Sequence, residues 1–131
     1  MQNILTGIFA AYSGNAALKA ALTGGLYLEQ APQGTALPYA TFFTVAGRPD
    51  YWLGELMYEM LTVQFDIYAD TDAKRQTAYS ALTALYDDLR PTVTGYTAVI
   101  MERNFQQMLR DGDQDQFFRA IVTYECRFKK T

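Results

Sequence analysis

The clearest pattern in the chain lies between Met57 and Ala69, where apolar and polar residues alternate. The apolar positions are Leu61, Val63, Phe65 and Ile67, and the polar positions between and beside them are Thr62, Gln64, Asp66 and Tyr68. An alternation of period two over this length is typical of a strand with one face in the core and the other in water. We therefore predict a half-buried antiparallel strand over residues 57–69, and we place the other segments relative to it.

The stretch after this strand has helical periodicity. Asp70, Thr71 and Asp72 offer an N-cap and acidic groups for a first turn, and Pro91 ends the run. Apolar residues recur three or four positions apart at Ala78, Ala81, Leu82, Leu85 and Leu89. This spacing predicts an amphipathic helix over residues 71–89, whose apolar stripe packs against the apolar face of the strand.

The N-terminal segment is predicted to be helical in two pieces. Asn3 can cap a first helix that Ser13-Gly14 interrupts, and Asn15 can start a second, shorter one. Gly24-Gly25 ends the second piece, because a glycine after a helix can take the left-handed conformation. The residues that follow, 26–29, are expected to form a short strand.

Three further segments have the composition of strands, namely residues 39–46, 96–105 and 117–128. The last two are expected to pair as a hairpin. If Asp111-Gly112 forms the centre of a type I′ turn, Phe105 faces Phe118. The same register places Met101 opposite Val122 and Val99 opposite Tyr124. A longer loop over residues 106–116 is the alternative, because that span is mostly Gln, Asp and Arg.

The predicted order of elements is α-β-β-β-α-β-β, with the N-terminal helical pieces counted as one. The fold class is α+β, an antiparallel β-sheet with two helices packed on one face. With 131 residues, half of them hydrophobic, the chain suits a single domain over residues 1–131 with one core.

Composition excludes several classes of function. A net charge of −3 and a pI near 4.8 argue against tight nucleic-acid binding, which needs a clustered basic surface. No segment approaches the roughly 20 apolar residues of a membrane-spanning helix. There is no histidine and one cysteine, so an intrachain disulfide is impossible and a reducing cytoplasm is the natural folding compartment. Between Met1 and Gly47 only Lys19 and Glu29 are charged, which hints at surface buried by a partner.

Acidic residues raise the question of a calcium site. Asp111, Asp113 and Asp115 alternate as calcium ligands do. An EF-hand also needs a glycine after its third ligand and a glutamate at its end, and Gln116 and Val122 stand at those positions. We therefore expect a solvated loop, with no metal and no cofactor.

Catalytic chemistry is also not expected. Asp70 and Asp72 are explained by capping of the helix and by its dipole, so a pair with Asp66 for hydrolysis is a weak candidate. Cys126 lies among apolar positions of the last strand, where a buried thiol is usually inert, and there is no histidine to activate it. The sequence thus predicts a domain without an active site.

Contact residues are instead expected in two exposed segments. The first is a loop over Gly47–Gly54 that carries Arg48, Tyr51 and the only tryptophan, Trp52. Trp, Tyr and Arg are the residues most enriched at the energetic centres of interfaces. The alternative for Trp52 is that it folds back onto the sheet edge. The second segment is the polar connection near the C-terminus, with Arg110, Asp111 and Asp113 as its candidate contacts.

Three stretches in fixed order carry a resemblance. They are "AALKAALTGGLYLEQAPQGTALPYATF" after the first helix, "LTVQFDIYA" leading into the long helix, and "RAIVTYECRF" in the last strand. Together they resemble the tail-completion proteins (tail terminator, or head–tail joining proteins) of tailed bacteriophages and prophages, over nearly the whole chain. The sequence departs from that resemblance at Tyr51-Trp52 and in the Asp-rich stretch, which leaves the partner contacts open.

The resemblance implies a structural protein of the virion. Such a protein forms a ring, commonly a hexamer, at the end of the tail tube, where it stops tail polymerisation and joins the tail to the head connector. Its partners would be other copies of itself, the tail-tube protein and the connector or neck protein, with DNA passing through the ring. It would be made in the host cytoplasm and end at the tail–neck junction. The alternative is a small α+β module that binds a ligand or peptide without catalysis.

Overall fold

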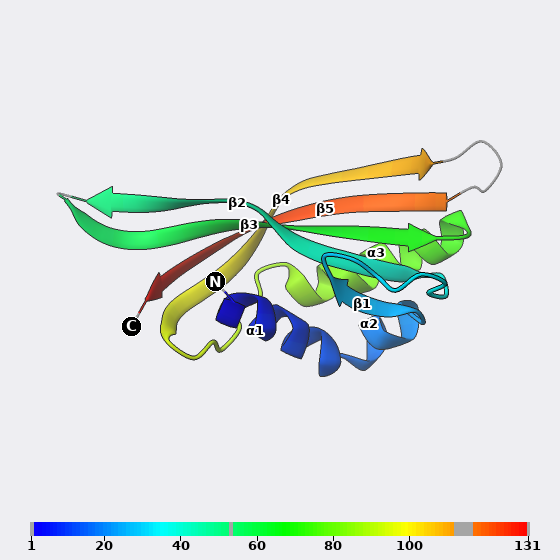
Figure 1. Cartoon of the computed structure of the whole chain (residues 1–131), viewed down its shortest axis with the longest axis horizontal. Coiled ribbons are helices and arrows are strands. Elements are labelled where there is room, and N and C mark those ends of the chain that lie inside the picture. The colour runs from blue at the N-terminus through cyan, green and yellow to red at the C-terminus, as the bar shows by residue number, and fades with distance from the viewer. Residues whose placement is uncertain (1, 53, 112–116, 131) are drawn as a thin grey trace.

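A computed structural model describes residues 2–52, 54–111 and 117–130, and it contains one five-stranded sheet with helices on one face (Figure 1). The helices are α1 (Gln2–Ser13), α2 (Ala16–Ala21) and α3 (Asp72–Tyr86). The strands are β1 (Gly25–Leu28), β2 (Tyr39–Trp52), β3 (Glu55–Ala69), β4 (Tyr96–Asp111) and β5 (Phe117–Lys130). The predicted α+β class and order of elements are confirmed, with the N-terminal helical unit present as two helices.

The sheet has the order β1-β2-β3-β5-β4, so the strand recognised first in the sequence, β3, lies at its centre. It pairs antiparallel with β2 on one side and with β5 on the other. The short strand β1 pairs with β2 in parallel, which makes that edge of an otherwise antiparallel sheet mixed. All three helices lie on the same face of the sheet, below it in Figure 1.

An aromatic cluster joins the sheet to the helices. The ring of Phe65 on β3 lies 5.8 Å from that of Phe42, 4.8 Å from that of Tyr86 and 5.8 Å from that of Tyr124. All four side chains are buried. The Tyr86 hydroxyl donates a hydrogen bond of 2.7 Å to the carbonyl of Ile8, so one α3 side chain connects α1, the sheet and its own helix.

Two of the three predicted helix caps are present. Asn15 Oδ1 accepts a hydrogen bond of 2.8 Å from the Leu18 amide at the start of α2, and Thr71 caps α3 in the same way. The Asn3 cap is wrong, because Asn3 lies inside α1 and its side-chain amide donates to the carbonyl of Thr94 at 3.2 Å. Local capping rules therefore predict the starts of α2 and α3. The side chain of Asn3 instead contacts a segment that is distant in the sequence.

The predicted loop over Gly47–Gly54 is wrong for most of its length. β2 continues to Trp52 and β3 begins at Glu55, so the two strands form a long hairpin. Pro49 is tolerated because β1 ends opposite Phe42, which leaves the outer edge of β2 beyond that point without a strand partner in the described chain. Gly54, with a φ of 80°, supplies the conformation that the tight connection requires.

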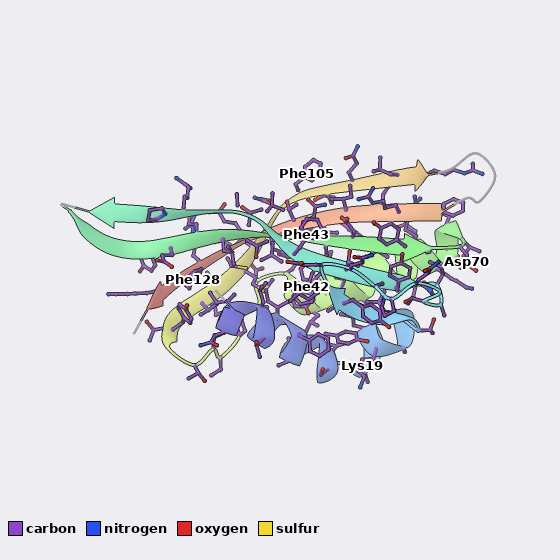
Figure 2. All side chains as sticks on the ribbon, viewed as in Figure 1. Lys19, Phe42, Phe43, Asp70, Phe105 and Phe128 are labelled. Carbon is purple, nitrogen blue, oxygen red and sulfur yellow. The ribbon has the colours of Figure 1, made fainter. Side chains whose placement is uncertain are left out.

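Both predictions for the final hairpin are also corrected. β4 remains a strand to Asp111, so a loop beginning at residue 106 is excluded, while residues 112–116 lie outside the described residues. Phe105 pairs with Thr123 and not with Phe118, and Met101 pairs with Cys126. A β-bulge just before Phe105 shifts the register and reverses the faces of the residues after it. Phe105 is consequently 48% exposed and lies on the helix-free face (Figure 2).

Candidate assembly surfaces

The residues expected to make contacts lie at opposite ends of the sheet. Arg48 is on β2, whose hairpin with β3 reaches the left end of Figure 1 and carries the backbone of Tyr51 and Trp52. Arg110 and Asp111 are the last residues of β4, at the right end of the same view. Asp113 lies outside the described residues. The candidates therefore do not form one site.

The hairpin of β2 and β3 extends beyond the rest of the sheet. In the part of the chain that the structure describes, β3 pairs with β5 only from Glu59 onward. Glu55, Leu56 and Tyr58 pair with β2 alone, and the β2–β3 register shifts between Leu56 and Tyr58. We call residues 50–58 the arm. At its base, Arg48 and Pro49 are exposed and, with Met60, help to line a groove of about 370 Å³. The ring of Tyr58 on the arm is 39% exposed.

The opposite end of the sheet is tied to α3. The guanidinium of Arg110 lies 5.3 Å from the ring centroid of Phe118, and that of Arg75 on α3 lies at the same distance from it. Arg75 also donates a hydrogen bond of 2.9 Å to the carbonyl of Leu109 and forms an ion pair with Asp72. Arg110 thus packs on its own hairpin, while its exposed side chain remains accessible to a partner.

An apolar groove lies between α1 and the edge strand β1, and the sequence pattern did not single it out. It has a volume of about 370 Å³ and is lined by Leu5, Thr6, Phe9, Leu26, Tyr27, Leu28 and Phe42. Phe9 is 42% exposed and Leu28 is 41% exposed. Large apolar side chains gathered around a groove on the surface of a small protein are typical of an interaction site. The scarcity of charge before Gly47 was the only sequence signal for this surface.

The helix-free face of the sheet carries a polar network around Asp66. This residue alternates with core positions of β3 and yet is only 4% exposed. Its carboxylate accepts hydrogen bonds from Gln64 at 2.8 Å and from Arg119 at 2.9 Å. The Arg119 guanidinium lies 5.4 Å from the ring of Tyr68, which stacks on Tyr39 at 5.1 Å. The hydrogen bonds from Gln64 and Arg119 offset the cost of burying the Asp66 carboxylate.

The ionisable groups in the core are kept neutral. Burial raises the pKa of the Cys126 thiol to about 12, and repulsion from Glu125 is the second, smaller cause. The reactive thiolate is therefore scarce at neutral pH. Burial raises the pKa of Tyr86 above its ordinary value, and burial together with a hydrogen bond to Asp87 does the same for Tyr124. Among the described residues, no group of three or more Cys, Asp or Glu could hold a metal ion. None of the described helices is long and apolar enough to cross a bilayer.

The sequence from residue 6 to residue 129 matches the family model described as "Tail completion protein gp17". The chain belongs to this family. The match covers the whole arm and every lining residue of the apolar groove except Leu5. Membership in the tail completion family gives the chain a structural role in a phage tail, and structural tail proteins are not normally catalytic.

Solved structures share the fold of this tail completion protein. A chain from the "Virion of native gene transfer agent (GTA) particle" superimposes with a TM-score of 0.72 at 11% sequence identity, covering 92% of this chain and 90% of that one. A second solved chain, whose description states no function, has a TM-score of 0.52 at 16% identity and covers 97% of this chain and 98% of its own. At such identities the likeness shows the fold alone. No curated protein sequence matches.

Proposed function

We propose that this chain forms a ring, with six copies, at the head-proximal end of the phage tail tube. The ring stops polymerisation of the tube and joins the tail to the head connector. Each chain works as one domain over residues 1–131, and its partners are its own copies, the tail-tube protein and the connector or neck protein. DNA passes through the ring without binding tightly.

The presence of two unlike surfaces on each chain supports the ring. A cyclic assembly uses two different patches on each subunit, because the front of one copy must meet the back of the next. The arm and the apolar groove are two such unlike surfaces, and they lie on different parts of the molecule. A protein that associated through a twofold axis would need only one self-complementary patch.

The place of the ring in the particle is supported by the family. A tail completion protein acts where a tail is finished, and the structural neighbour with a TM-score of 0.72 is a component of an assembled virion. The net charge of −3 suits a passage for DNA, because an acidic protein does not hold the phosphate backbone. Exposed arginines at both ends of the sheet, Arg48 and Arg110, are available for partner contacts.

Disruption of the gene in the phage or prophage that encodes the chain tests this proposal. Electron microscopy of the lysate should show full heads without tails, and free tails that are overlong or irregular at one end. Expression of the wild-type chain from a plasmid should restore joined particles. Tails of normal length joined to heads in the disrupted strain would overturn the proposal. A chain that stays monomeric and never sediments with tails would favour the ligand- or peptide-binding module.

A further inference from the structure

The apolar groove favours an occupant that places apolar side chains in it. None of its seven lining residues is charged, and the first 47 residues of the chain contain only Lys19 and Glu29 as charged groups. Beside the groove runs β1, an edge strand of four residues that pairs with β2 on one side and, within the described part of the chain, with no strand on the other. An unpaired strand edge next to an apolar groove accepts an extended segment with apolar side chains, since such a segment satisfies both surfaces.

The arm has the matching properties. Its sequence, DYWLGELMY, has three aromatic residues, which is unusual for a ribbon that leaves the sheet. Among the residues that the structure describes, residues 55–58 of β3 have no β5 partner. This edge is therefore open over the same length as β1, with one irregularity where its pairing to β2 shifts register between Leu56 and Tyr58. A two-stranded ribbon standing alone in water is marginally stable at best. The arm therefore offers an open backbone edge that can pair with β1 and apolar residues that can lie in the groove.

We infer that the arm of one copy lies in the apolar groove of the next copy, with residues 55–58 of β3 pairing along β1 and Tyr58 contacting Phe9 and Leu28. This inference rests on the proposed ring and specifies the contact that closes it. Each copy gives its arm to one neighbour and receives the arm of the other, so one heterologous contact repeats around the ring. Backbone pairing fixes the register, and the apolar contact supplies most of the affinity.

The other long edge of the sheet is a weaker candidate for this contact. Its strand, β4, is already bonded near both ends, because the Met101 amide donates to the carbonyl of Leu89 at 2.9 Å and Arg75 donates to the carbonyl of Leu109. The exposed Phe105 lies close to Glu102 and Arg103, both charged and exposed. That edge therefore offers an interrupted run of open backbone groups and a less apolar setting than β1.

A matched pair of substitutions tests the groove. Phe9→Glu and Phe105→Glu make the same change at two phenylalanines of similar exposure, 42% and 48%, on different surfaces. With Phe9→Glu in the disrupted strain, joined particles should fall at least about tenfold, because a charge would be buried in an apolar contact. Phe105→Glu should complement as wild type does. Equal complementation by both variants would overturn the inference. Tyr58→Glu on the arm should repeat the Phe9→Glu defect, and melting temperatures close to wild type exclude misfolding.

Cysteine cross-linking tests the contact itself and separates it from the proposed function. Leu28→Cys and Tyr58→Cys together should give a ladder of disulfide-linked oligomers when assembled tails are oxidised, while Leu28→Cys with Phe105→Cys should give none. The native Cys126 is fully buried and does not compete. A ring on wild-type tails with no Leu28–Tyr58 cross-link would overturn this inference and leave the proposed function standing. Tails without any ring would overturn both.

Discussion

Removal of one hydroxyl group from the core tests the way α3 holds the fold together. Tyr86 is fully buried and donates its 2.7 Å hydrogen bond to the Ile8 carbonyl, 78 residues away in the chain. Tyr86→Phe keeps the ring contacts with Phe65 and Tyr124 and removes only that bond. Because the carbonyl of Ile8 remains part of the α1 backbone ladder, the cost is that of one net hydrogen bond, about 1 kcal/mol. For a chain of this length, that lowers the melting temperature by about 4 °C.

Thermal unfolding followed by circular dichroism measures this shift. Tyr58→Phe is the matched control, since the same change at a side chain that is 39% exposed should alter the stability by less than about 0.5 kcal/mol. Tyr86→Ala, which also removes the ring, should cost about 3 to 5 kcal/mol. If Tyr86→Phe melts at the wild-type temperature, the hydroxyl does not hold α1 to α3 and the packing described here is wrong.

Three further predictions concern the core, the helix-free face and the thiol. Leu82→Asp, at a fully buried position of α3, should cost about 3 kcal/mol or more by chemical denaturation, and Leu85→Asp should cost less because that side chain is only half-buried. Arg119→Ala should cost about 2 kcal/mol by leaving the Asp66 carboxylate buried with one partner fewer, and adding Asp66→Asn should recover part of the loss. Cys126 should resist thiol reagents at pH 8 until denaturant is added. The pKa of this thiol rises from 9.0 in the unfolded chain to about 12 in the folded one. The resulting contribution to the free energy of unfolding is fully present below pH 9 and is lost as the pH rises toward 12, because the unfolded chain releases its thiol proton first.

The sequence was sufficient to predict features that depend on residues close to one another in the chain. The alternation of β3 and the apolar spacing of α3 each reflect a single buried face, and Asn15 and Thr71 act as caps through hydrogen bonds within three residues of themselves. The same reasoning overlooked Tyr86 as a core residue of α3. Its ring is buried only because Phe65 and Tyr124, from two different strands, converge on it.

Features set by distant contacts were not predictable from the pattern. The bulge before Phe105 inserts one residue and reverses the face of those after it, and nothing in the alternation of β4 marks its position. The segment Gly47–Gly54 was predicted to be a loop, although Pro49 within it is tolerated on a strand whose outer edge is open, as on β2 beyond β1. The groove beside Phe9 depends on α1 lying against β1, which is a matter of tertiary packing.

The central claim is that copies of this chain form a closed ring at the end of the tail. Image reconstruction by electron cryomicroscopy of the head-proximal end of intact tails tests it most directly. We expect a ring of six copies at the last layer of the tube, with each arm lying against the α1–β1 groove of its neighbour. A tail end without such a ring, or this chain at another position in the particle, would contradict the account.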